Sequence, residues 1–376
     1  MADTVAGDGA GRDADTARTA VHPRTRAGRP PAMVDVAVAA GVSHQTVSRV
    51  LNEHPNVSPE VRTRVLNAVE RLGYRRNSAA RALVTRRSGT IGVVTSGSTL
   101  FGPTRTLVAI EHAARAQGLF VSLATVGEWR KDRVRSAIDH FLDQGADGIV
   151  VIASHDEAAA AVEELEHRVP LVVVGRAGLE GHASTVAIDQ VAGGAVATQH
   201  LLDLGHRDVL HLAGPAPWLD ARARAVGFRE TMAAAKLAPR TLWAEDWSAE
   251  TGFRAANELL WRVGRRRTQM PTAIFAANDL LALGMIHALA RAGVRVPDDV
   301  SVVGYDDGDG SAHFSPPLTT VAQEFDELGY RCLDLLMAAQ SGGVPTVELV
   351  PPRLLVREST AAPRSAGGPW GPAVGV

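Results

Sequence analysis

Residues 33–52, MVDVAVAAGVSHQTVSRVLN, have the pattern of two short helices joined by a tight turn. Gly41 suits the end of the first helix, because glycine adopts backbone conformations that other residues resist. Ser43 suits the N-cap of a second helix that runs from about residue 44 to residue 51. The apolar residues of both segments recur at helical spacing, at Val36, Ala37, Ala40, Val47, Val50 and Leu51.

The outer face of the second helix carries polar side chains and a cation, namely His44, Gln45, Ser48 and Arg49. Forked polar groups and a cation at the start of a short amphipathic helix are what reading base edges in the major groove requires. The stretch therefore indicates a helix-turn-helix. An ordinary helical hairpin with a solvated face is the alternative.

A third helix follows, with Ser58 as its cap and Pro59 at its first position. After Gly73 closes it, the run GYRRNSAARALVTRRSGTIGVV (residues 73–94) holds five arginines. The chain here resembles the LacI/GalR family of bacterial repressors, and the resemblance continues to about residue 360. Its motifs stand in the family's order and spacing: DVAVAAGVSHQTVSRVLN, NVSPEVR, LGY and NSAARALVTRRSGTIGVV.

The resemblance implies roles for side chains of the three-helix head, residues 32–76. His44, Gln45 and Arg49 would contact base edges, with Asn56 as a further candidate, while Ser43 and Thr46 would face phosphates. His44 and Gln45 would choose the operator, since family members vary most at these positions. His44 could instead be a surface histidine. Ala32 stands where a Ser or Thr cap usually precedes the first helix, so the start of that helix is expected to be weaker by roughly 1 kcal/mol.

A basic hinge, residues 77–88, links the head to the rest of the chain. From Asn77 to about Val84 it is short and poor in core-forming residues, so alone it should be disordered. In the family this segment becomes a helix only on operator DNA, where a leucine at the position of Leu83 enters the minor groove. A flexible basic linker is the alternative.

From Thr90 onward, β-branched runs alternate with helical stretches, which predicts parallel sheets wrapped by helices. The first series is IGVVTS, FVSLATV, GIVVIAS and LVVVG, and a second series starts near Thr185 with TVAID, DVLHLAG, LWAEDW, AIFAAND and VSVVGYDD. Two such halves predict two doubly wound subdomains with a ligand cleft between strand C-termini. LTTVAQ (318–323) and the segment around 349–353 are expected to return between the halves.

The predicted fold class is α/β: a helix-turn-helix head and a two-lobed body that resembles the periplasmic sugar-binding fold of the family's effector domains. The first lobe would take about 89–187 plus 324–348, and the second about 188–321 plus 352–362. The body as a whole, 89–362, would bind effector and form a dimer. Residues 1–31 are predicted to be a disordered tail and 363–376 a flexible one. No leucine-heptad helix of the kind that makes some members tetramers is present there.

Composition agrees with a nucleic-acid-binding head on a more acidic body. Residues 1–90 hold 14 Arg against 8 Asp plus Glu, a net of +6, so the remainder of a chain whose charge is −2 carries −8. No apolar run approaches the roughly 20 residues that span a bilayer. No signal-peptide core is visible, so a cytoplasmic, nucleoid-associated protein is expected. The single cysteine, Cys332, excludes an internal disulfide and fits a buried helical position.

The second half places polar and aromatic groups at strand ends, where a cleft would lie. A sugar needs forked polar groups for its hydroxyls and an aromatic platform for its C–H face. The candidates are Arg224, Asn278, Asp306 and Gln323 for the first, and Trp247 and Phe325 for the second. By resemblance, these six match effector contacts of a galactoside-responsive family member, and Ser96, Leu100 and Pro103 fall at further matching places. That member has an aspartate where this chain has Gly175, which puts a galactoside in doubt.

Three other interpretations of these residues stay open. Asn278 and Asp279 could cap the following helix, with Asp279 the expected cap and Asn278 the expected ligand contact. The pairs Arg222/Arg224 and Asp306/Asp307 could form one buried ion-pair network. Asp307 and Asp309 hint at a calcium loop, but no glutamate follows at the required spacing.

The sequence thus predicts a sugar-responsive transcriptional repressor. It would be a dimer that binds palindromic DNA and is released from it when a small sugar, such as a galactoside or a glucoside, binds between the lobes. A regulator of the same fold with a co-repressor such as a purine is the alternative, as is a two-lobed sugar-binding protein without a regulatory role. We expect no catalytic residues, metal or cofactor, because no P-loop, G-x-S-x-G or dinucleotide fingerprint is present.

Overall fold

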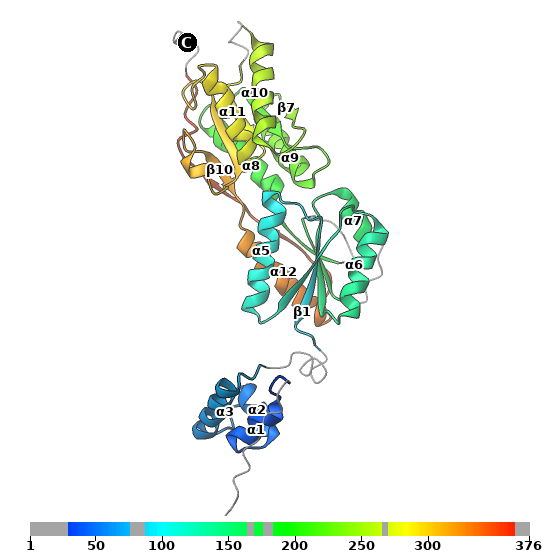
Figure 1. The fold of residues 1–376 in the computed structure, drawn as a ribbon. Coiled ribbons are helices and arrows are strands. Elements are labelled where there is room, and N and C mark those ends of the chain that lie inside the picture. The colour runs from blue at the N-terminus through cyan, green and yellow to red at the C-terminus, as the bar shows by residue number, and fades with distance from the viewer. Residues whose placement is uncertain (1–28, 76–86, 164–168, 176–182, 265–269, 365–376) are drawn as a thin grey trace, which may run out of the picture. The chain divides into compact units, whose positions relative to one another are not determined.

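The computed structural model divides the chain into two units, residues 1–81 and 82–376 (Figure 1). It describes residues 29–75, 87–163, 169–175, 183–264 and 270–364. Most of the predicted tails and most of the predicted hinge, including Asn77 and Leu83, lie outside the described residues. Among those described, no helix is both long and apolar enough to cross a membrane.

The first unit is a three-helix head: α1 (Met33–Ala40), α2 (His44–Leu51) and α3 (Pro59–Leu72). Gly41 and Gly73 end α1 and α3 with φ angles of 63° and 61°, in the left-handed region that glycine favours. Ser43 Oγ accepts a hydrogen bond from Thr46 N at 3.1 Å, which caps α2 as the sequence predicts. The core gathers small apolar side chains from all three helices, among them Val36, Val47, Val50, Val65 and Ala68.

The start of α1 is better held than expected. Ala32 offers no side-chain cap, but the Asp35 carboxylate accepts a hydrogen bond from Ala32 N at 2.8 Å. Arg29 in turn donates to both oxygens of Asp35 at 3.1 Å. The acidic half of a capping box therefore offsets part of the loss at Ala32.

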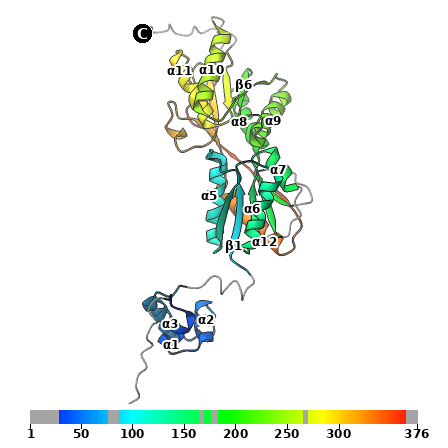
Figure 2. The same cartoon turned by 45° about the vertical axis from the view of Figure 1, so that its right-hand side comes forward.

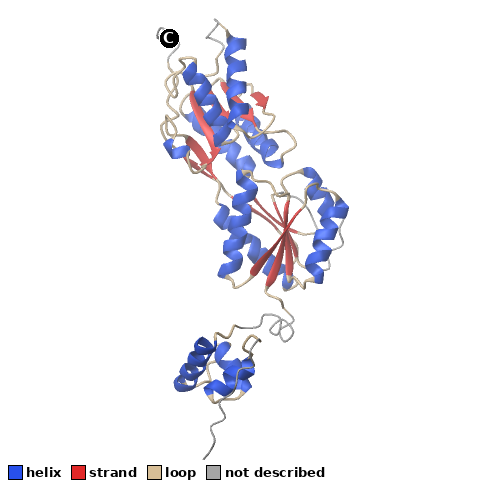
Figure 3. Cartoon of the chain, viewed as in Figure 1, coloured by secondary structure: helices blue, strands red, loops and turns tan. Residues whose placement is uncertain are grey.

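The second unit holds two lobes, each built on a six-stranded sheet with helices on both faces (Figures 1 and 3). In the first lobe the strand order is β11-β5-β4-β3-β1-β2, and all pairs are parallel. Its strands are β1 (Thr90–Thr95), β2 (Phe120–Thr125), β3 (Gly148–Ile152), β4 (Leu171–Val174), β5 (Ser184–Ile188) and β11 (Val347–Val350).

Two helix pairs cover the first sheet. Figures 1 and 2 both place α5 (Phe101–Ala116) opposite α6 (Lys131–Asp143) and α7 (Asp156–Glu163). The face under α5 and α12 (Phe325–Gln340) is an apolar cluster that includes Ile110 and Leu336. The side chain of Phe141 is buried in the apolar cluster on the opposite face of the sheet. Cys332 on α12 is fully buried in this core, as the sequence predicts, and burial raises the pKa of its thiol.

The second lobe has the strand order β12-β10-β9-β8-β6-β7. Its strands are β6 (Val209–Ala213), β7 (Arg240–Trp243), β8 (Ala273–Ala276), β9 (Ser301–Asp306), β10 (Thr319–Ala322) and β12 (Arg353–Leu355). Its helices are α8 (Gln190–Asp203), α9 (Leu219–Ala234), α10 (Ala249–Val263) and α11 (Asp279–Arg291). α8 and α9 cover one face of this sheet, and α10 and α11 cover the other.

Two expectations about these strands are corrected. The sequence pattern groups the TVAID run with the second series, but the run is β5 and pairs with β4 and β11 of the first sheet, in agreement with the predicted end of the first lobe near residue 187. Its β-branched pattern predicts a buried strand but cannot say which sheet receives it. The second sheet is also not wholly parallel, because β12 pairs antiparallel with β10. The main chain crosses between lobes after Ile188, after Ala322 and after Val350.

Candidate effector pocket and DNA-reading face

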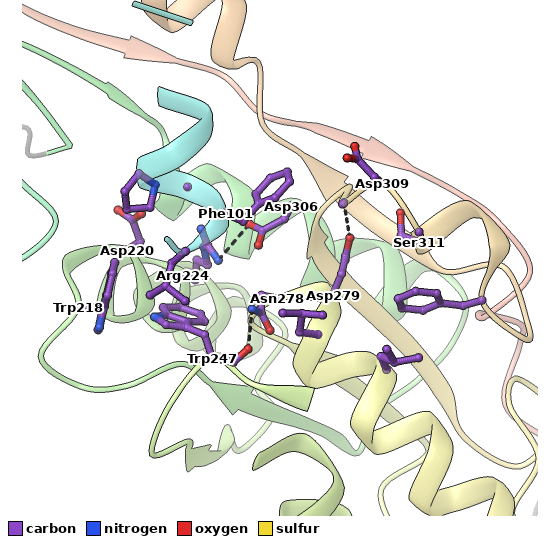
Figure 4. Close-up of a pocket in the computed structure, with 18 residues that line it drawn as sticks. Phe101, Trp218, Asp220, Arg224, Trp247, Asn278, Asp279, Asp306, Asp309 and Ser311 are labelled. Carbon is purple, nitrogen blue, oxygen red and sulfur yellow. Dashed lines mark hydrogen bonds and ion pairs between the residues drawn. The ribbon is translucent and has the colours of Figure 1, made fainter. Parts of the chain in front are cut away.

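A cavity of about 290 Å³ opens where the two lobes meet. The second lobe supplies most of its wall from the ends of β8 and β9 and the starts of α9 and α11, and the first lobe supplies the start of α5 (Figure 4). This is the edge of a parallel sheet where helix N-termini and strand C-termini meet, the usual ligand site of such folds. Six of the nine predicted effector residues line it: Leu100, Pro103, Arg224, Trp247, Asn278 and Asp306.

Arg224 is the buried centre of the polar floor. Its guanidinium donates from Nε to Gln190 Oε1 at 2.9 Å and from Nη1 to the Ala277 carbonyl at 2.5 Å. It also lies 3.7 Å from the Tyr305 ring centroid and 5.6 Å from that of Trp247. These contacts fix the fork in one orientation, so it can present a hydrogen-bonding edge to a ligand without rearranging.

Asp306 completes the floor at the end of β9. Its Oδ1 lies 3.7 Å from Arg224 Nη1 and accepts a hydrogen bond from Gln323 Nε2 at 2.8 Å. Burial raises the pKa of this carboxyl to about 8, while Arg224 acts in the opposite direction. The residue has a φ of 110°, a conformation that residues with side chains rarely adopt and that gathers at functional sites.

The roles of Asn278 and Asp279 differ from the expectation. Asn278, in extended backbone before α11, is the helix cap: its Oδ1 accepts from Leu281 N at 2.8 Å. Its Nδ2 donates to the Trp247 carbonyl at 3.1 Å, which ties the cap to the aromatic wall. Both residues border the cavity.

Asp279 organises the loop beyond β9 instead of capping α11. It accepts hydrogen bonds from Gly308 N at 2.8 Å and Thr320 Oγ1 at 2.5 Å. Burial raises the pKa of its carboxyl to about 6.

The cavity has three aromatic lining residues that the sequence analysis missed, Trp218, Phe101 and Phe314. Trp218 packs edge-on to Trp247, with centroids 5.8 Å apart and planes at 89°. It also contacts His155 of the first lobe, with centroids 4.3 Å apart. Trp218 follows β6 in the loop GPAPW, so its place at a strand end was a signal that could have found it.

Three predicted residues lie beside the cavity and do not line it. Gln323 is bonded to Asp306 and Gln190 behind the floor. Phe325 is buried and packs edge-on to Phe101 at 5.8 Å, so Phe101 is the ring that faces the cavity. Ser96 accepts a hydrogen bond from Ser98 N at 3.3 Å in the loop after β1.

The single ion-pair network considered from the sequence is not formed. Arg222 pairs with Asp156 of the first lobe at 2.7 Å, so it joins the two lobes at the rim. Asp307 pairs with Arg357 at 2.7 Å, and only Arg224 and Asp306 lie together at the floor.

The head presents the predicted reading face. His44, Gln45 and Arg49 of α2 are exposed, as is Ser43, while Thr46 is half-buried beside the cap. Asn56 is exposed in the loop before α3. Val47 and Val50 point into the core, so the outer face of α2 is free to enter a groove.

Comparison with known proteins agrees with both units. Residues 32–77 match the family described as bacterial regulatory proteins, lacI family, and residues 198–360 match the periplasmic binding protein-like domain. The lactose operon repressor of Escherichia coli (strain K12) is 34% identical over 339 residues, which cover 90% of this chain and 92% of that protein. The chain belongs to the lacI family of bacterial regulatory proteins.

Solved lacI-family structures share the arrangement. The lac repressor dimer bound to operator and the anti-inducer ONPF aligns with a TM-score of 0.75 at 33% identity, over 89% of this chain and 100% of that one. The complex of the transcriptional regulator CelR with cellobiose aligns with a TM-score of 0.63 at 32% identity, over 88% and 99%. As a lacI-family member, this chain is a DNA-binding transcriptional repressor regulated by an effector. The family member whose effector contacts the six cleft residues are expected to match is the lactose repressor.

Proposed function

We propose that the protein is a dimeric repressor that binds a palindromic operator and is released by an uncharged sugar held between its lobes. Two heads would read two half-sites through His44, Gln45 and Arg49, with Asn56 as a further base contact. Ser43 and Thr46 would face phosphates. The cavity carries the sugar assignment, because it joins the polar floor of Arg224 and Asp306 to the ring of Trp247.

The relatives support this choice of ligand. CelR has been solved with cellobiose, and the polar floor described here suits the hydroxyl groups of such a sugar. By family resemblance, the hinge residues Asn77 and Leu83 would bind the centre of the operator. Effector would change how the lobes are oriented and so withdraw that contact. The proposed function contains no catalytic step and would be carried out in the cytoplasm, at the nucleoid.

The test has two stages, both with the full chain. Selection from a random duplex library should enrich an inverted repeat. Fluorescence anisotropy with that repeat should then show that a galactoside, cellobiose or another glucoside weakens binding about 5- to 150-fold, the usual range of coupling between two sites. Failure to prefer any inverted repeat over random duplex at moderate salt would contradict the DNA assignment. Tightening by a nucleobase, with no response to any sugar, would contradict the sugar assignment.

A further inference from the structure

Asp220 is a carboxylate at the cavity wall whose oxygens meet no hydrogen-bond donor among the described residues. It lies in the first turn of α9, one turn before Arg224, and is half-buried. Burial raises the pKa of its carboxyl, against the opposing effects of Arg224 and His155. An acidic side chain in the first turn of a helix interacts favourably with the helix dipole, but that interaction does not require a place beside a ligand cavity.

The charges around the cavity set Asp220 apart. Four aspartates and one arginine line it: Asp220, Asp279, Asp306, Asp309 and Arg224. Asp279 is satisfied by Gly308 and Thr320, and Asp306 by Gln323 and Arg224. Asp309 is exposed to solvent at the rim. Among the described residues, Asp220 is thus the one lining carboxylate that is half-buried and has no hydrogen-bond donor from the protein.

A half-buried carboxylate at a cavity wall that has no donor from the protein is free to accept hydrogen bonds from a ligand in the cavity. Hydroxyl groups of an uncharged sugar are suitable donors, and Trp218 precedes Asp220 by two residues, so an apolar ring borders the same wall (Figure 4). An anionic ligand would meet an unpaired negative charge instead, which disfavours its binding.

Gly175 bears on which lobe can supply such an acceptor. By the family resemblance, an aspartate is the expected residue at this position of the first lobe. Here Gly175 has a φ of 109°, and a Cβ atom would lie 2.6 Å from the Ala153 carbonyl oxygen. A side chain at this place would crowd the Ala153 carbonyl in a strained backbone conformation, and the carboxylates that line the cavity all come from the second lobe.

We propose that Asp220 is the specificity-determining carboxylate of this pocket, accepting hydrogen bonds from hydroxyls of an uncharged sugar and rejecting anionic sugars. The proposal rests on the proposed function, since it concerns the same site. It restricts the effector class to neutral sugars and their neutral glycosides, and excludes sugar phosphates and uronic acids.

The test uses p-nitrophenyl glycosides and the corresponding uronides, which differ in a CH₂OH or carboxylate group. Calorimetry with the full chain should show binding of a neutral glucoside or galactoside and much weaker binding of its uronide. Asp220→Asn should weaken the neutral ligand by about 10- to 100-fold, as expected for loss of charge-assisted hydrogen bonds. Asp220→Asn should also lower the ratio of the uronide Kd to the neutral glycoside Kd by about 10-fold or more. Asp220→Glu should restore that ratio.

The selectivity ratio separates this role from a structural one, because general damage to the pocket weakens both ligands alike. Asp334→Asn, the same charge change at an exposed position of α12, controls for net charge. The proposal would be overturned if Asp220→Asn left the ratio of uronide Kd to glycoside Kd unchanged. It would also be overturned if the wild-type protein bound uronides as tightly as neutral glycosides. Release of the operator by sugar in the same wild-type preparation would show that the proposed function stands even then.

Discussion

Gln190 donates a hydrogen bond from Nε2 to Oε1 of Gln323 over 2.8 Å, and the two residues lie at two of the three places where the chain crosses between lobes. Gln190 begins α8 just after β5, and Gln323 follows the end of β10. The pair belongs to a closed ring, because Arg224 binds Gln190 and Gln323 binds Asp306. A ligand that contacts Arg224 or Asp306 therefore acts on groups bonded directly to the lobe crossings.

Gln190→Met tests this ring, because methionine keeps the length of the side chain and removes both hydrogen bonds. Arg224 Nε and Gln323 Oε1 would lose a buried partner, so the free energy of unfolding should fall by about 1–3 kcal/mol, measured by denaturant titration. Effector affinity should fall with it. Gln199→Met, an exposed position of the same helix, should change the unfolding free energy by less than about 0.5 kcal/mol. Equal effects of the two substitutions would argue against the ring.

Gly175→Asp should destabilise the first lobe and fail to create a new ligand contact. The φ of 109° and the nearby Ala153 carbonyl leave no relaxed position for a side chain, at a cost of about 1–3 kcal/mol. Thermal unfolding and galactoside titration provide the measurements. Gly127→Asp, where an added Cβ would meet open space, is the matched control. A stable variant with improved galactoside affinity would show that the backbone at Gly175 tolerates an aspartate.

His211 should make the second lobe sensitive to acid. It is fully buried, and burial lowers the pKa of its imidazole from 6.5 to about 4. The unfolded chain therefore binds the proton first, and stability is lost as the pH falls from 6.5 towards 4, by up to roughly 3 kcal/mol. In His211→Phe, the difference in unfolding free energy between about pH 7 and pH 4 should shrink by a similar amount. The same pH dependence in both proteins would assign the acid sensitivity to other groups.

Gln45→Ala should weaken operator binding by about 1–3 kcal/mol and relax the preference for one base pair in each half-site. Anisotropy with a set of operators, each changed at one base pair, measures both effects. Gln144→Ala at the C-cap of α6 in the body makes the same substitution on an exposed residue away from the head. Uniform weakening across all the altered operators would indicate that Gln45 contacts the DNA backbone and does not read a base.

The elements of the head and the lobes followed closely from the sequence because their signals are local. Ser43, Gly41 and Gly73 mark helix ends through their own backbone or side-chain chemistry, and the structure places each as predicted. The sheet that receives β5 is decided by pairing with β4 and β11, which are separated from it in the chain. No local pattern carries that information.

The site was predicted less completely for a related reason. Strand ends located Arg224, Asp306 and Trp247, but the same rule also selected Phe325, which packs away from the cavity against Phe101. That Asn278 and not Asp279 caps α11 depends on which residue keeps extended backbone before that helix. Side-chain direction and hydrogen-bond partners are tertiary facts, so a sequence can place a residue near a site without showing which way it faces.

Effector and operator bind at different sites of one protein, and each is expected to weaken the binding of the other. Reciprocal titration tests this coupling most directly. Operator affinity is measured with and without saturating sugar, and sugar affinity is measured with and without saturating operator. Linkage predicts that both ratios are equal and at least about fivefold, with sugar and operator opposing each other. A sugar that binds the free and the operator-bound protein with the same affinity would contradict the account.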